Sequence, residues 1–83
     1  MTVQLNMPVI SFLSDAVQRH AAKHAGLQPR TIFLHPAFMR RIQRELQPPA
    51  PAPVFTLWGV DIIYDSDADY PAMETVDGDV EFI

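Results

Sequence analysis

Three carboxylates alternate along the run Asp65–Asp69, which is the spacing at which a calcium-binding loop begins. Such a loop also requires Gly at its sixth position and a bidentate Glu at its twelfth. Those positions hold Tyr70 and Val76 in this chain, and Glu74 lies two residues too early. We therefore interpret the run as a solvated acidic loop that holds no metal ion.

His20 and His24 are spaced i, i+4, so on a helix their rings lie on one face and can share a metal ion. His35 is the one further ligand that we consider. The metalloprotease pattern places Glu directly after its first His, but residue 21 is Ala. We expect no metal site, with His24 at the edge of an apolar helix stripe and His20 at its rim.

Three arginines, Arg40, Arg41 and Arg44, lie close together and form a candidate basic face on a helix. Helices joined by a connector invite comparison with DNA-reading proteins, but residues 26–35 contain a strand-like run where those proteins have a tight turn. The chain also carries a net charge of −4, whereas nucleic-acid-binding domains are usually basic. We therefore favour a solvated helix face that pairs partly with the acidic C-terminal segment, and we do not expect a nucleic acid as partner.

Enzyme signatures do not occur in this chain. It has no cysteine, no nucleophile-elbow sequence and no glycine-rich phosphate loop. The aromatic residues Phe55, Trp58 and Tyr64 can line a pocket, but aromatics beside a strand glycine more often belong to a core. We predict a protein that is not an enzyme, with no catalytic residue, no cofactor and no small-molecule substrate.

Charge is divided sharply along the sequence. Residues 1–60 carry all six Lys and Arg against two carboxylates, a net +4, and residues 61–83 carry eight carboxylates and no base, a net −8. Such a split permits internal neutralisation, two kinds of partner, or head-to-tail self-association. The acidic residues that we predict to bind a partner are Asp65, Asp67, Asp69, Glu74, Asp77 and Asp79, and the basic ones are Arg40, Arg41 and Arg44.

The pattern of apolar and turn residues predicts a single domain over residues 1–83. A helix is expected over about 8–25, capped by Asn6 or alternatively by Ser11 or Ser14, then a strand over 30–34 and a second helix over about 36–47. Residues 48–53, PPAPAP, predict an extended crossover within the domain. A β segment follows, in which Gly59 is either a turn between two short strands or a bulge within one.

These elements indicate an α+β fold of order α-β-α-β-β, with both helices on one face of a small, mostly antiparallel sheet and a C-terminal hairpin. A two-residue turn at Asp77-Gly78 would place Met73 opposite Phe82 and Glu74 opposite Glu81. The predicted core consists of Leu13, Val17, Ile32, Leu34, Phe38, Ile42, Phe55, Leu57, Val60 and Ile62. The N-terminal segment has neither the basic start of a secretory signal nor the length of a membrane span, so we expect an intracellular protein without a membrane partner.

The stretches TIFLHPAFMRRIQREL and LWGVDIIYDSDADYP resemble a pattern of short tailed-phage proteins and of the late segment of phage capsid-type subunits. In that pattern a strand ends in a residue-Pro pair that opens a helix, and a spacer, Leu-x-Gly, an apolar strand and a loop ending in Pro follow. The resemblance covers about residues 31–71. It implies a phage-like origin and a binding role, in the cytoplasm of a host cell or in the virion. The chain lacks the long spine helix and extended arm of shell subunits, so shell formation is not implied.

Our leading hypothesis is a non-enzymatic protein–protein interaction module, an accessory assembly protein or a self-associating one. The first alternative is a phage-type inhibitor of a host nucleic-acid-binding machine, whose acidic C-terminal segment mimics phosphate. The second alternative is nucleic-acid binding through the arginine helix.

Overall fold

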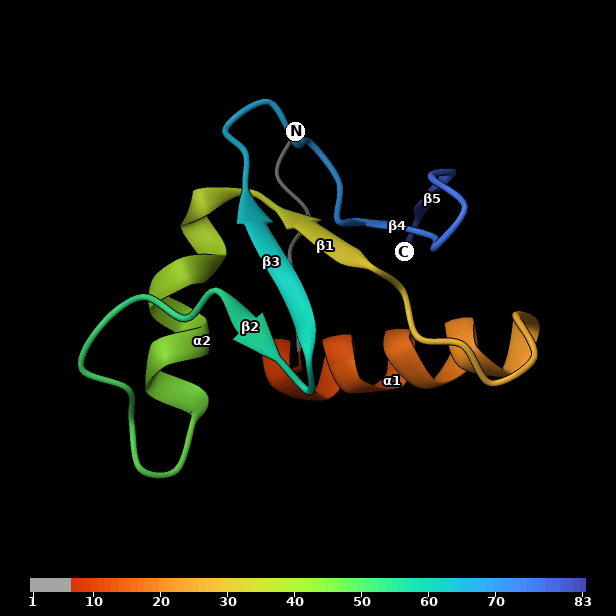
Figure 1. Cartoon of the computed structure of the whole chain (residues 1–83). Helices are drawn as coiled ribbons and strands as arrows, with labels where there is room; N and C mark the ends of the chain where they lie inside the picture. Colours follow the sequence, from red (N-terminus) through yellow and green to blue (C-terminus); the bar gives the residue numbers. More distant parts are fainter. Residues whose placement is uncertain (1–6) are drawn as a thin grey trace.

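The structure is a computed structural model that describes residues 7–83 of the chain and has an α+β fold, as predicted (Figure 1). Two helices, a 3₁₀ turn and five strands alternate along these residues. They are α1 (Val9–Lys23), β1 (Thr31–Leu34), η1 (Pro36–Phe38), α2 (Met39–Glu45), β2 (Thr56–Leu57), β3 (Val60–Tyr64), β4 (Ala72–Glu74) and β5 (Val80–Phe82). None of the helices described is long and apolar enough to cross a membrane.

The five strands form one sheet in the order β2-β3-β1-β4-β5. β1 lies at its centre, parallel to β3 and antiparallel to β4. The β1–β3 pair is parallel because η1, α2 and the proline-rich segment carry the chain back across the sheet before β3 begins. The two outer strands join by hairpins, so the remaining pairs are antiparallel, as predicted for most of the sheet.

The core lies between the helices and one face of the sheet. Alternate positions of a strand face the same side of a sheet. The positions that face the helices are occupied by Ile32, Leu34, Val60 and Ile62, which pack against the apolar faces of α1 and α2. Other buried members of this core include Val9, Leu13, Ala16, Val17, Phe38, Ile42, Leu57 and Met73. Phe55 is a correction to the predicted core, because it precedes β2 and remains more than half exposed.

Helix α1 has a different N-terminal arrangement from the one predicted. Ser11 and Ser14 lie inside the helix and do not cap it, and Asn6 lies outside the described residues. The backbone N–H of Ile10 donates instead to a carboxylate oxygen of Glu45 on α2, at 2.8 Å. A carboxylate suits this position because the first N–H groups of a helix lack intrahelical partners and carry partial positive charge.

The segment around Gly59 forms a turn between two short strands, the first of the two alternatives predicted. Trp58 and Gly59 have φ angles of 52° and 79°, as a two-residue type I′ hairpin turn requires. Leu57 then pairs with Val60, and the buried positions on β3 alternate with exposed ones. The Tyr64 hydroxyl at the far end of β3 donates to the Val54 carbonyl at 2.6 Å and anchors the end of the proline-rich crossover.

The C-terminal hairpin forms as predicted, but its register is shifted by one residue. Met73 lies opposite Glu81 and Ala72 opposite Phe82, so the predicted pairs Met73–Phe82 and Glu74–Glu81 are wrong. The reason is a longer loop. Thr75 and Asp79 pair across it, Gly78 donates to the Thr75 carbonyl at a φ of 93°, and Asp79 N–H donates to the Thr75 hydroxyl. This is a type I turn closed by a left-handed glycine, so three residues separate the last pair of the hairpin.

Candidate interaction surface

Among the described residues, no helix covers one face of the sheet, and this face presents apolar side chains. Strand alternation places Phe33, Ile63, Ala72, Val80 and Phe82 on this side, and we call these five residues the open sheet face. A cross-strand row runs from Ile63 through Phe33 and Ala72 to Phe82. Ile63 is 48% exposed, Val80 58% and Phe82 77%. Large exposed apolar residues gathered in this way are typical of a contact surface.

A hollow of about 300 Å³ adjoins the open sheet face. Its walls come from the sheet and from the acidic loop that follows β3, namely Phe33, Asp67, Ala68, Asp69, Tyr70, Ala72, Val80 and Phe82. The loop is shaped by Asp65, whose side chain accepts from the N–H of Asp67 at 2.9 Å and whose own N–H donates to the Leu34 carbonyl. Apolar walls therefore meet carboxylates at one end of the open sheet face.

The predicted acidic residues lie in two groups, one at each end of β4. Asp65, Asp67 and Asp69 are exposed in the loop before β4, and Asp77 and Asp79 are exposed in the hairpin loop after it. Glu74 lies at the end of β4 and faces the same side as the open sheet face, because its neighbour Met73 faces the core. The structure thus brings the predicted acidic residues to the borders of one surface.

Within residues 7–83, most of these carboxylates have no basic partner. Of the eight carboxylates from Asp61 to Glu81, Glu81 alone pairs with a base within residues 7–83 of the structure, through Lys23 Nζ at 3.0 Å. The other ion pairs with Lys or Arg in this part of the chain join residues one helical turn apart, Asp15 with Arg19 and Glu45 with Arg41. The acidic segment is therefore not neutralised by the arginine helix in the described part of the chain.

The predicted basic residues lie in the helical layer. Arg40 and Arg44 are exposed on α2, while Arg41 is half-buried and contacts Glu45 at 3.9 Å and the Met7 carbonyl at 3.2 Å. Helix α2 spans seven residues, and β1 separates it from α1, so a helix-turn-helix unit does not form over residues 9–45. The predicted basic residues Arg40, Arg41 and Arg44 therefore lie on α2, whereas the predicted acidic residues border the open sheet face.

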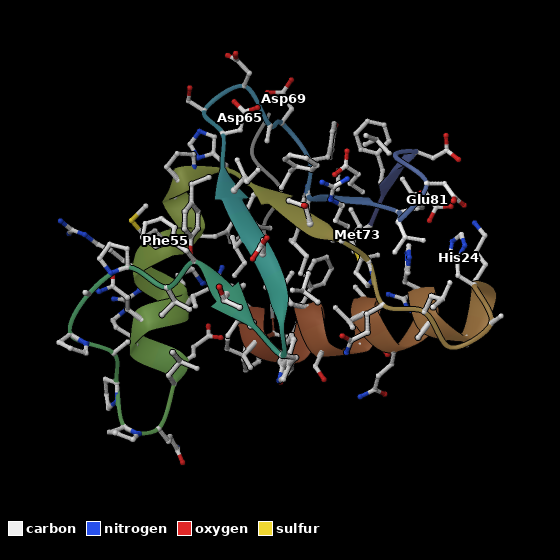
Figure 2. All side chains as sticks on the ribbon, viewed as in Figure 1. His24, Phe55, Asp65, Asp69, Met73 and Glu81 are labelled. Carbon is white, nitrogen blue, oxygen red and sulfur yellow. The ribbon has the colours of Figure 1, made fainter. Side chains whose placement is uncertain are left out.

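A second group of polar side chains lies where the C-terminal end of α1 meets β5. His20 and His24 stack with their ring centroids 4.2 Å apart, and Glu81 approaches both (Figure 2). Burial and the neighbouring His24 lower the pKa of His20, so its imidazole favours the neutral form. Hydrogen bonds from Lys23 and His24 lower the pKa of Glu81 and keep it ionised.

The structure reverses the predicted roles of the two histidines. His20 is 5% exposed and belongs to the buried face of α1, whereas His24 is half-buried at its margin. His35 lies apart from them and accepts from the N–H of Ala37 at the start of η1. Glu81 is the residue that sequence reasoning missed, because the predicted register turned it away from α1. Thr75, whose hydroxyl accepts from the N–H of Asp79 in the longer loop, is the local residue that could have indicated the observed register.

Figure 2 shows the separation of the two candidate regions, with Asp65 and Asp69 beyond the end of β3 and His24 and Glu81 at the end of α1. Phe55 lies apart from both, on the β2 side of the sheet. Its ring contacts Tyr64 edge to face, with centroids 5.7 Å apart. Comparison with known proteins gave no match to a family model, to a curated protein or to a solved structure.

Proposed function

We propose that this chain is a non-enzymatic protein–protein interaction module that docks a partner on its open sheet face. The observation that carries this proposal is the exposure of Phe82, 77% of whose surface is free, on an edge strand whose partner strand is buried. A Phe side chain left in water forgoes about 1.5–3 kcal/mol of burial free energy. A protein surface that covers Phe82 and Ile63 recovers that free energy on binding.

The partner that fits this surface is a protein with an aliphatic or aromatic anchor flanked by Lys or Arg. The hollow beside Phe82 accepts the anchor, since its walls include Phe33, Tyr70 and Val80. The basic flanks are favoured because Asp67 and Asp69 line the same hollow and have no ion pair within residues 7–83. Aromatic anchors in such pockets carry most of the free energy of an interface, while rim charges set specificity and association rate.

A second copy of the chain fits less well face to face. Two open sheet faces in contact would bring Asp67 and Asp69 of one copy near the same carboxylates of the other, which is unfavourable. A head-to-tail arrangement, with Arg40 and Arg44 of one copy against the acidic loop of the next, avoids that repulsion. Sedimentation velocity at low and high salt tests it, because a species larger than the monomer that dissociates with salt identifies the occupant as the chain itself.

Peptide selection tests the proposal without a known partner. A random-peptide display library is selected on the wild-type chain and counter-selected on Phe82→Ser. The expected consensus is one aliphatic or aromatic anchor flanked by Lys or Arg. Enriched peptides should bind Phe82→Ser at least about tenfold more weakly, the loss typical of a hot-spot residue. Phe55→Ser is the matched control, since Phe55 is also exposed but lies outside the open sheet face. A consensus without basic residues, or equal loss in both variants, would refute the proposal.

The phosphate-mimic inhibitor is the second candidate, and it is favoured by the carboxylates of Asp65, Asp67 and Asp69, which form no ion pair within residues 7–83. Its partner is a basic nucleic-acid-binding groove that recognises charge alone. The two functions differ in which variant loses binding. The triple change of these aspartates to Asn should abolish capture of a basic groove while Phe82→Ser leaves it intact. A larger loss of binding from Phe82→Ser than from the aspartate changes supports docking on the open sheet face. The resemblance of residues 31–71 to short tailed-phage proteins supports placing either function in a host cytoplasm or a virion.

A further inference from the structure

Three metal-ligand atoms converge where α1 meets β5. His20 Nδ1 lies 3.3 Å and His24 Nε2 3.0 Å from Oε1 of Glu81, and the three ligand atoms lie within 4.8 Å of one another (Figure 2). The residues come from segments 57 or more positions apart in the sequence, so the fold assembles the group. The geometry points to a binding site for a divalent transition-metal ion of the zinc class, held by His20, His24 and Glu81.

A buried nitrogen without a hydrogen bond is the independent observation. The His20 side chain is 2% exposed, and its Nδ1 atom is buried without a hydrogen-bond partner in the described structure. Glu81 Oε1 is near it, but the approach does not meet hydrogen-bond geometry. Buried side-chain polar atoms usually have a partner. A metal ion that accepts the Nδ1 lone pair supplies that partner.

The distances between the ligand atoms suit a small ion. Zn–N and Zn–O bonds are about 2.0–2.2 Å long, so two ligands of a tetrahedral site lie roughly 3.3–3.6 Å apart. The two separations from Glu81 Oε1 are already 3.0 and 3.3 Å. The two imidazole nitrogens lie within 4.8 Å of each other, so side-chain rotations that shorten this distance would let all three atoms surround one ion.

Neighbouring groups complete the environment of the site. Lys23 Nζ donates to Oε2 of Glu81 at 3.0 Å, which orients the carboxylate and leaves Oε1 directed at the histidines. Outer contacts of this kind tune the affinity of metal ligands. A hollow of about 170 Å³ borders His20, Lys23 and Glu81 and has room for a water molecule as fourth ligand.

The donor atoms define the class of ion. Two imidazole nitrogens and one carboxylate oxygen suit zinc, nickel, copper or iron, whereas calcium and magnesium prefer oxygen ligands alone. A bound ion would tie the edge strand β5 to α1. Since β5 also carries Phe82 and Val80, the ion would fix the position of one border of the open sheet face.

The alternative is an ion-paired cluster in which Glu81 links Lys23 and His24 and holds no metal. Titration calorimetry on the full chain without an affinity tag separates the two. Zinc alone should bind with one ion per chain, and calcium alone should give no binding heat. A hundredfold excess of free zinc over the Kd should raise the Tm by roughly 10–20 °C, because the ion binds only the folded chain.

Variants assign the binding to these residues. His24→Gln and Glu81→Gln should each lower zinc affinity by at least about tenfold, since even an outer-shell partner of a metal ligand contributes that much. Asp77→Asn is the matched control, an exposed carboxylate in the adjacent loop, and should bind zinc like the wild type. Circular dichroism before titration establishes that each variant is folded.

Lys23→Met provides a test that does not remove a ligand. It leaves all three ligand atoms and removes the ammonium group, so the ion-paired cluster loses a member while the metal site keeps its donors. A smaller loss of zinc affinity in this variant than in His24→Gln or Glu81→Gln supports the site, because Lys23 contacts a ligand and is not itself one. Absence of zinc binding to the wild-type chain overturns the proposal. Equal zinc binding by His24→Gln and the wild type overturns it as well.

Discussion

Ile62 and Ile63 are neighbours on β3 that face opposite sides of the sheet. Ile62 is 3% exposed in the core, whereas Ile63 is 48% exposed on the open sheet face. We predict that Ile62→Ala destabilises the chain far more than Ile63→Ala does. The comparison is matched, because the loss of β-branching is the same in both variants and its effect on strand propensity largely cancels.

The magnitudes follow from burial. Truncation of a fully buried Ile to Ala costs about 2–5 kcal/mol, because burial free energy is lost and a cavity remains. Ile63 buries about half of its surface and leaves no closed cavity, so its truncation costs roughly 1 kcal/mol. A chain of this length has a total stability of about 4–12 kcal/mol. Ile62→Ala therefore removes a large share of it, and each kcal/mol lowers the Tm by about 4–8 °C.

Urea denaturation followed by far-ultraviolet circular dichroism measures both free energies of unfolding. The variants should have wild-type m-values, since the surface exposed on unfolding hardly changes. Equal destabilisation of about 2 kcal/mol or more in both variants would refute the conclusion that the core lies on only one side of the sheet. Repeating the measurement over a fiftyfold range of protein concentration identifies self-association as the cause, because an interface between copies makes the stability depend on concentration.

Two further predictions concern contacts that tie distant segments together. The Tyr64 hydroxyl donates a hydrogen bond to the Val54 carbonyl, so Tyr64→Phe should lower the free energy of unfolding by about 0.5–1.5 kcal/mol below pH 10. Burial raises the pKa of Tyr64 in the folded chain, so the stability of the wild type falls as the pH rises above 10. The difference between the wild type and Tyr64→Phe should therefore shrink in that range. Urea titrations from pH 8 to 11 measure this, and a difference that stays constant to pH 11 contradicts it. Glu45→Ala should cost about 0.5–2 kcal/mol because Ile10 N–H loses its acceptor, whereas Glu45→Gln should keep most of the stability. Thermal unfolding of the pair measures this, and a wild-type Tm for Glu45→Ala would contradict it.

Local patterns in the sequence predicted the elements that depend on near neighbours. The spacing of Leu13 and Val17 correctly indicated the buried face of α1, and Ile42 did the same for α2. Gly59 indicated either a turn or a bulge, and the turn is the alternative that forms, with positive φ at both central positions as a type I′ turn requires. Each of these features depends on residues that are close to one another in the sequence.

Contacts between distant segments escaped prediction. Glu45 caps α1 across 35 residues, and no local signal identifies a cap supplied by another helix. His20 is buried and His24 is not, because the buried face of α1 follows Leu13, Ala16, Val17 and His20 and not the i, i+4 row that continues to Ala21. The apolar stripe of a helix is wide enough to include either row of residues, and the packing of α1 against the sheet determines which row is buried.

The register of the C-terminal hairpin decides both candidate sites at once. Side chains alternate along a strand, so a shift of one residue exchanges the two faces of β5. The predicted register would place Phe82 toward the core and Glu81 toward solvent. The observed register does the opposite: it exposes Phe82 on the open sheet face and turns Glu81 toward His20 and His24.

This arrangement departs from the usual placement of apolar residues inside and charged residues outside. Such local departures concentrate at functional sites, where another requirement outweighs simple burial. Ile83, the residue directly after β5, packs against the core, so this segment still contributes an apolar contact. Glu81 recovers part of its desolvation penalty through Lys23 and His24. A buried-side Glu81 beside an exposed Phe82 is therefore compatible with a stable fold. These adjacent positions supply the inward-facing ligand of the proposed metal site and the outward-facing anchor of the proposed interface.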